Sequence, residues 1–142
     1  MTVRTARASW APSEQGGGGG NIRTESGTIS VPYSAGSRFG SDPGTNPEEL
    51  LGAAHAACFN LALAAGLKGS GHPAARLETA AEVTLEKLTE GYRITTIHLV
   101  TAAEVPDITE EEFQEQAHQT KLSCPVSKAL AGCDIFLEAK LT

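Results

Sequence analysis

Two cysteines of this sequence occur in settings that suit redox chemistry. Cys58 lies within the apolar stretch NPEELLGAAHAACFNLAL, which starts at Asn46, and Cys124 stands directly before Pro125. A cysteine at the start of a helix is close to unpaired backbone N–H groups, which stabilise a thiolate and lower its pKa. Two cysteines in different elements can pair if their Cα atoms come within about 4.4–6.8 Å. The sequence permits this pairing and does not prove it.

Cys58, His55 and Cys133 each have a plainer, structural interpretation. Free cysteine is among the most buried residue types, so Cys58 alone could be an inert core thiol. His55, three residues before it, could be a base for Cys58 or part of a metal site. Zinc needs three or four ligands, and no second Cys/His cluster is present, so a packed or interface histidine is favoured. Cys133 is interpreted as a passive buried thiol.

A long helix is predicted to carry Cys58. Pro47 follows two cap-type residues and suits the first helical position, and Glu48 and Glu49 favour the positive end of the helix dipole. The pattern predicts a helix over about residues 47–67. Because nearly all of its positions are small or apolar, we expect it to be buried. One of its faces is predicted to carry Leu51, Ala54, Cys58, Leu61 and Ala65.

Short strands are predicted before this helix. The segments RTARASWA (4–11) and GTISVPY (27–33) lie on either side of a run of five glycines at 16–20. We interpret the glycine run as a wide hairpin loop between the two strands. Serines, glycines and prolines fill residues 34–45, which are predicted to be a further loop.

A second hairpin is predicted after the helix. In LETAAEVTLEKL (77–88), apolar and polar residues alternate as in a half-buried strand, and GYRITTIHLV (91–100) is rich in β-branched residues. The two segments meet at Glu90–Gly91. They are therefore predicted to pair in an antiparallel manner.

The last third of the chain is predicted to contain two helices and a strand. Thr109 and Glu112 form a capping box that opens a helix reaching about Leu122. After Cys124, the segment PVSKALA (125–131) is predicted to be a short helix. CDIFLEAKLT (133–142) has the alternation of a final strand.

The element order predicts an α+β fold with largely antiparallel sheets, in a single domain over residues 1–142. A helix that is apolar on nearly all sides needs more cover than a domain of this size provides. We therefore predict a homodimer in which two such helices pack together.

Charge and composition exclude several classes of protein. The net charge of −6 without a basic patch argues against binding to nucleic acid. His55 and Asn60 interrupt the most apolar run, so it is interpreted as a core helix and not as a membrane span. The N-terminal MTVRTARASW lacks the apolar stretch of a signal peptide, and three cysteines are an odd number for a disulfide framework. We expect a protein of the reducing cytoplasm.

Two motifs carry a family resemblance. TNPEELLGAAHAACF and CPVSKAL, with 65 residues between their cysteines, resemble the signature pair of the OsmC/Ohr family of organic hydroperoxide reductases. RTESG and SRFGSDPGTNPEEL further resemble the OsmC branch of that family. The likeness extends over most of the chain, from about Trp10 to Leu141. The five-glycine run is unusual for the family, and Cys133 has no assigned role in its pattern.

The resemblance implies a thiol peroxidase with an OsmC-like fold, assembled as an intertwined homodimer whose active sites lie at the subunit interface. It implies that Cys58 is the peroxidatic cysteine and Cys124 the resolving cysteine. It likewise assigns Arg38 as the active-site arginine and Glu48 as the carboxylate that pairs with it. The reductant implied by the resemblance is an external dithiol, of lipoyl type in this family.

Physical chemistry accounts for these residue types. A thiolate attacks a peroxide oxygen, releases an alcohol and becomes a sulfenic acid, and a second cysteine then condenses with it to a disulfide. A permanent cation such as Arg38 favours the thiolate, and Glu48 can hold the guanidinium through a charge-assisted contact. An apolar wall of leucines and Phe59 suits alkyl hydroperoxides.

Helix geometry limits how such a site is built. Glu48 and Cys58 are ten residues apart, so on one straight helix they are separated by roughly 15 Å. Either the site draws on both subunits or the helix begins later than predicted, and we favour the first alternative.

The sequence contains no nucleotide, flavin, haem or metal motif, so no cofactor is expected. Two other functions stay open. One is a hydrolase that uses Cys58 and His55, although no third orienting group can be assigned. The other is a non-catalytic stress or ligand-binding protein whose thiols are structural.

Overall fold

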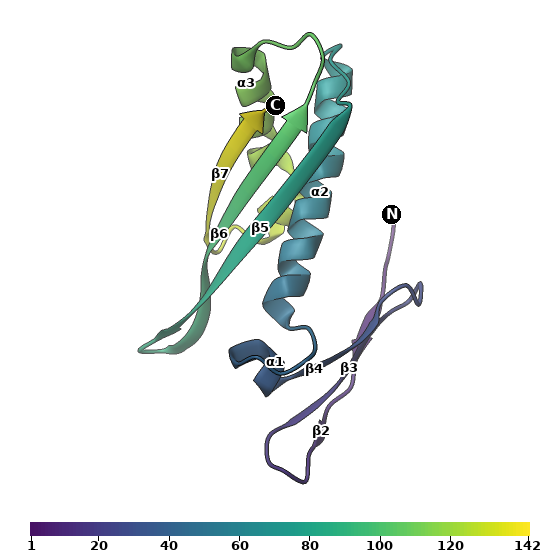
Figure 1. Ribbon diagram of the computed structural model, residues 1–142, viewed down its shortest axis with the longest axis vertical. Coiled ribbons are helices and arrows are strands. Elements are labelled where there is room, and N and C mark those ends of the chain that lie inside the picture. Colours follow the sequence, from purple (N-terminus) through teal and green to yellow (C-terminus); the bar gives the residue numbers. More distant parts are fainter. The chain divides into compact units, whose positions relative to one another are not determined.

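The chain is described over all residues 1–142 by a computed structural model (Figure 1), and it divides into two compact units, Met1–Leu50 and Leu51–Thr142. Each unit carries its own sheet, and the long predicted helix is present. The predicted α+β fold with mostly antiparallel sheets is therefore confirmed. A single domain over the whole chain stays a prediction.

The first unit contains an antiparallel sheet built around one strand. Its members are β1 (Ala6–Ala8), β2 (Ala11–Pro12), β3 (Gly18–Thr24) and β4 (Ser30–Ser34). β3 pairs with β1, β2 and β4. Gly19 pairs with Ala11 in β2 and also with Ser34 in β4, so β3 is the central strand of this sheet.

The prediction of a wide loop over the five glycines was wrong. Only Gly16 and Gly17, both with positive φ, lie in the turn between β2 and β3. The other three glycines begin β3, where a Cβ at Gly18 would lie 2.6 Å from the Ala11 carbonyl oxygen, and one at Gly19 would lie 2.5 Å from that of Tyr33. Glycine is needed there because the neighbouring backbones approach closely.

The prediction of a loop over residues 34–45 was also wrong in part, because it contains the short helix α1 (Ala35–Phe39). Ser34 caps this helix: its Oγ accepts a hydrogen bond from the backbone N–H of Ser37, and the Ser37 Oγ accepts one from the N–H of Ser34. A capping box usually has Glu or Gln at the third position. A serine there gives a weaker sequence signal.

The second unit contains a three-stranded sheet and most of the helical residues. α2 (Pro47–Gly69) begins in the first unit and continues into the second; it is followed by β5 (Arg76–Leu88), β6 (Gly91–Glu104), α3 (Glu110–Ser123), α4 (Pro125–Ala129) and β7 (Asp134–Leu141). The strand order is β5-β6-β7. β5 and β6 are antiparallel, whereas β7 runs parallel to β6. In Figure 1, α2 runs along this sheet.

Most elements predicted beyond residue 46 are confirmed. The long helix begins at Pro47 as expected, and the hairpin turn lies between Leu88 and Gly91. The predicted capping box opens α3, since the Thr109 Oγ1 accepts a hydrogen bond from the N–H of Glu112 at 3.2 Å. The short helix after Cys124 and the final strand are also present.

The core lies between α2, the sheet and α3. Its α2 stripe consists of Gly52, His55, Phe59, Leu63 and Leu67, all of which are buried. Phe59, Leu63 and Leu67 belong to one apolar cluster with Ile97 and Leu99 of β6 and Phe113 and Ala117 of α3.

The face of α2 that we predicted to pack is a different one. Leu51 and Cys58 are half-buried, and Ala54, Leu61 and Ala65 are exposed, Leu61 to 76%. The choice of face was wrong because almost every position of this helix is apolar, so the 3.6-residue period does not single out one stripe. The expected burial on all sides is not present in a single protomer.

By length and composition, α2 is long and apolar enough to cross a membrane, and 28% of its most apolar window is buried within the protomer. A single such helix is a weak sign of a membrane protein, because the core helices of soluble proteins meet the same criterion. One face of α2 packs on its own sheet, and an apolar face remains uncovered.

Candidate active site

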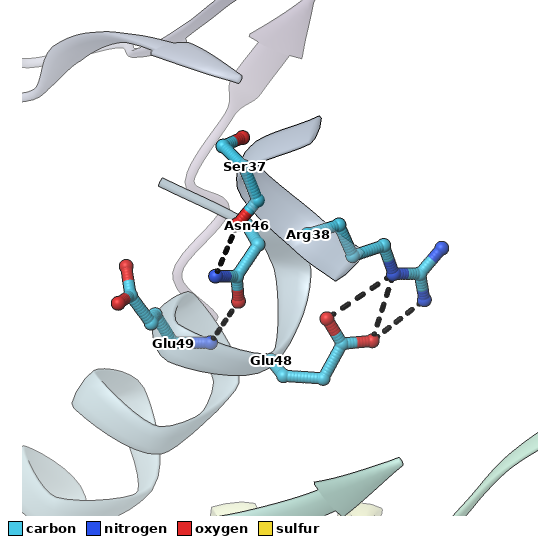
Figure 2. Close-up of polar contacts among 5 residues, drawn as sticks. All are labelled: Ser37, Arg38, Asn46, Glu48 and Glu49. Atoms are coloured by element: carbon cyan, nitrogen blue, oxygen red, sulfur yellow. Dashed lines mark hydrogen bonds and ion pairs between the residues drawn. The ribbon is translucent and has the colours of Figure 1, made fainter. Parts of the chain in front are cut away.

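Arg38 and Glu48 form a bidentate ion pair in the first unit (Figure 2). The Nε of Arg38 donates to both carboxylate oxygens of Glu48, at 3.1 and 3.2 Å, and a terminal nitrogen donates to Oε1 at 2.6 Å. Arg38 lies in the last turn of α1 and Glu48 in the first turn of α2. The fork of the guanidinium matches the carboxylate geometry and fixes its orientation.

A network of neutral hydrogen bonds holds the two helix ends that carry this pair. The amide of Asn46 donates to the Ser37 carbonyl at 3.2 Å, and its Oδ1 accepts from the backbone N–H of Glu49 at 2.9 Å (Figure 2). The Ser37 hydroxyl donates to the Thr45 carbonyl at 2.6 Å. Asn46 thus caps α2 as predicted and also ties it to α1.

The ion pair is partly open to solvent. The Arg38 side chain is 34% exposed and that of Glu48 is 11% exposed. The guanidinium also lies over the Phe39 ring, 5.3 Å from its centroid. Surface ion pairs add little stability, so the main consequence of this one is a cation held in a fixed position.

Cys58 and Cys124 approach each other in the second unit. Their sulfur atoms are 3.1 Å apart, and both cysteines are free thiols. Cys58 lies near the middle of α2, and Cys124 is fully buried where α3 ends and α4 begins. The backbone of Cys124 bonds in both directions: its N–H donates to the Thr120 carbonyl at 2.9 Å, and its carbonyl accepts from the N–H of Lys128 at 3.0 Å.

The two thiols differ in their tendency to ionise. Burial raises the pKa of Cys58, and its hydrogen bond with Cys124 raises it further. Burial also opposes the ionisation of Cys124, but the Ser127 N–H, the Cys58 thiol, the Ser127 hydroxyl and the Val126 N–H together lower its pKa. The Cys124 side chain makes no cap hydrogen bond to the first turn of α4, so the two backbone N–H groups act on it mainly through their dipoles. Within one protomer, Cys124 is the better thiolate.

His55 and Ser127 extend the thiol pair into the core. The Nε2 of His55 lies 2.7 Å from the Ser127 Oγ, and both residues are buried. Burial lowers the pKa of His55. The ring makes no hydrogen bond to Cys58, so the structure does not support His55 as a base for that thiol. Ser127 was not among the residues predicted from the sequence. Its position three residues after Cys124, in the first turn of the predicted short helix, could have indicated it.

The Cys133 thiol makes its hydrogen bond to the backbone and not to Cys58 or Cys124. It donates to the Leu130 carbonyl at 3.1 Å, and burial raises its pKa. This is the environment of a passive thiol, as the sequence suggested. No group of three or more His, Cys, Asp and Glu side chains is placed so that it could hold a metal ion.

Of the four predicted site residues, the structure brings Cys58 to Cys124 and Arg38 to Glu48. The profile of OsmC-like proteins matches residues 40–138. The chain belongs to the OsmC-like family. The predicted resemblance is thereby confirmed.

Curated and solved relatives agree with this assignment. The OsmC-like chain is 43% identical over 125 residues to peroxiredoxin OsmC of Escherichia coli strain K12, covering 87% of each chain. It is 36% identical over 109 residues to organic hydroperoxide resistance protein-like 2 of Staphylococcus epidermidis, covering 74% of this chain and 72% of the relative. The crystal structure of OhrB of Bacillus subtilis shares its fold, with a TM-score of 0.72 and 24% identity over 99% of this chain and 98% of that one.

Proposed function

We propose that this OsmC-like protein is a thiol-dependent peroxidase that reduces organic hydroperoxides to alcohols. The observation that carries the proposal is the 3.1 Å separation of the Cys58 and Cys124 sulfurs. The relatives named for peroxiredoxin activity and organic hydroperoxide resistance support the same class of reaction. The catalytic roles of the individual residues are part of this proposal.

The proposed cycle has three steps. The Cys58 thiolate attacks the peroxide, breaks the O–O bond and becomes a sulfenic acid, while the alkoxide takes a proton and leaves as the alcohol. The Cys124 thiolate then attacks the sulfenic sulfur, and hydroxide leaves as water after taking a proton. An external dithiol, by family resemblance of lipoyl type, reduces the disulfide and is itself oxidised to a disulfide.

Cys58 needs a cation that its own environment does not supply. Burial raises its pKa, and the influences on it include no Lys or Arg. α2 begins at Pro47 and runs unbroken to Gly69, so the helix does not start later than predicted. Along this helix Glu48 is separated from Cys58 by roughly 15 Å. We therefore propose that the Arg38–Glu48 pair of one subunit ionises Cys58 of the other.

The uncovered face of α2 supports the assembly that this arrangement needs. Ala54, Leu61 and Ala65 are exposed on it, which leaves apolar surface on which a partner can pack. A second copy that packs on this face gives a homodimer, as the family resemblance implies, and adds the cover that one protomer lacks.

The proposal is tested by mass spectrometry of the purified chain before and after one equivalent of cumene hydroperoxide, without a reductant. We expect the loss of two hydrogen atoms and a crosslinked peptide pair that joins Cys58 to Cys124. The Cys133→Ser chain should give the same crosslink. An unchanged mass, or a crosslink that involves only Cys133, would reject the proposed disulfide.

A complementation experiment tests the shared site. The Arg38→Met and Cys58→Ser chains are each expected to be inactive as homodimers. Random pairing of the two chains gives mixed dimers in half of the assemblies, and each mixed dimer has one complete site of two. Co-expression should therefore restore about a quarter of the parent activity if the site is built from both subunits.

The matched control is co-expression of Arg38→Met with the double variant Arg38→Met/Cys58→Ser, which should stay inactive. If Arg38 serves the Cys58 of its own chain, the first mixture stays inactive as well. That result would reject the shared site and leave the peroxidase reaction itself unaffected.

A further inference from the structure

The two ring nitrogens of His55 lie in different surroundings. Nε2 is within hydrogen-bond distance of the Ser127 Oγ at 2.7 Å, whereas Nδ1 is buried without any partner. A neutral imidazole carries hydrogen on only one nitrogen. Buried N–H groups without an acceptor are rare in proteins, so we assign the hydrogen to Nε2. Burial lowers the pKa of His55, which keeps the ring neutral.

This tautomer gives the contact a direction. His55 donates, and the Ser127 oxygen accepts. A serine hydroxyl has a single hydrogen, so the hydrogen of Ser127 is left for another acceptor. Ser127 is the third residue of α4 and Cys124 is its N-cap, and a side chain at the third position of a helix can reach back to the N-cap residue.

We propose that His55 and Ser127 are positioning residues for the Cys124 thiolate: His55 holds the Ser127 hydroxyl so that its hydrogen is donated to the Cys124 sulfur. This rests on the proposed peroxidase function, in which Cys124 attacks the sulfenic acid and later leaves from the disulfide. A cysteine stabilised as a thiolate is the better leaving group. The buried pair thus assists the resolving half of the cycle.

The other groups that act on Cys124 are close by and uncharged. They are the Cys58 thiol on α2 and the backbone N–H groups of Val126 and Ser127 at the start of α4; no Asp, Glu, Lys or Arg is among them. Removal of the Ser127 hydroxyl should therefore produce a measurable change in the pKa of Cys124.

The experiment titrates Cys124 by the ultraviolet absorbance of its thiolate in a full-length Cys58→Ala/Cys133→Ala chain. The same chain with Cys124→Ala supplies the blank. Ser127→Ala is expected to raise the pKa of Cys124 by about one unit, since the thiolate loses a hydrogen bond that stabilises its charged form. His55→Leu should raise it in the same direction.

Two conservative variants separate the proposed role from packing. Ser127→Thr keeps the hydroxyl, and His55→Gln keeps an N–H donor that does not titrate, so both should retain the low pKa of Cys124. The exposed neighbours Ser123 and His118 provide matched controls: Ser123→Ala and His118→Leu should leave it unchanged. Circular dichroism establishes that each chain is folded.

If folded Ser127→Ala or His55→Leu chains titrate like the parent, the proposal is rejected. If Ser127→Ala does not fold, the His55→Leu and His55→Gln chains are compared instead. Equal pKa values of Cys124 in those two chains would also reject the proposal. The titration needs no peroxide, so its failure leaves the peroxidase proposal standing, and a failed peroxidase assay leaves the titration interpretable.

Discussion

The Cys58→Ser chain is expected to reduce organic hydroperoxides at least about a thousandfold more slowly than the parent, because a serine hydroxyl stays protonated near neutral pH and oxygen at this position cannot form a sulfenic acid. Serine has nearly the same shape as cysteine, and Cys58 lies on a partly exposed face of α2, so the fold should be retained. The measurement is the steady-state rate of cumene hydroperoxide loss with an excess of dithiol.

The matched control for this experiment is Cys133→Ser, which removes a thiol that has no role in the proposed cycle and should keep the parent rate. A Cys58→Ser chain that retains even a tenth of the activity would show that another group attacks the peroxide. It would also favour the non-catalytic interpretation of the Cys58–Cys124 pair.

The second large effect is expected for Cys124→Ser. Without a resolving thiolate, the sulfenic acid at Cys58 persists, and further peroxide oxidises it to the sulfinic and sulfonic acids, which ordinary thiols do not reverse. Turnover should stop within a few equivalents of peroxide when the reductant is a bulky dithiol. Mass spectrometry should then find added oxygen on the peptide that contains Cys58.

This variant also separates the three functions that the sequence left open. A Cys58–His55 hydrolase would keep its activity in the Cys124→Ser chain, and a protein with purely structural thiols would show no oxygen added selectively at Cys58. Unmodified Cys58 after excess peroxide, in a folded chain, would contradict the peroxidase cycle.

Local signals were sufficient for most elements beyond residue 46. The start of α2 follows from Pro47 and the carboxylates after it, and the start of α3 from the reciprocal bonds of Thr109 and Glu112. Alternation of apolar and polar residues predicted β5, and the β-branched residues after Gly91 predicted β6 on the other side of the turn. These features depend on residues within a few positions of each other, which is why they can be predicted from one sequence.

The errors have a common physical origin in distant contacts. Glycines 18–20 belong to a strand whose neighbouring backbone, at Ser9, Ala11 and Tyr33, approaches closely, whereas composition alone suggests a loop. The packing face of α2 depends on where the sheet lies, since its apolar residues are distributed all round. The parallel pairing of β7 with β6, which was not predicted, likewise depends on the path of the chain between them.

The candidate site was predicted mainly through the family motifs. No spacing rule brings Cys58 to Cys124 across 65 residues, or brings Arg38, on a helix that was not predicted, to Glu48. His55 was correctly expected to be a packed residue, but its link to Ser127 depends on α4 lying against α2. The direction of that contact follows only from the unpartnered Nδ1.

The position of Cys124 between two helices limits the main-chain motion that formation of the proposed disulfide would need. Its N–H is hydrogen-bonded to the turn before it and its carbonyl to the turn after it, so backbone hydrogen bonds hold the main chain on both sides of the sulfur. A disulfide requires about 2.05 Å between sulfurs, and the gap from 3.1 Å is small enough to be closed by torsion about side-chain bonds. In the proposed cycle, the disulfide would then form and be reduced without unfolding of the helix ends that hold Cys124.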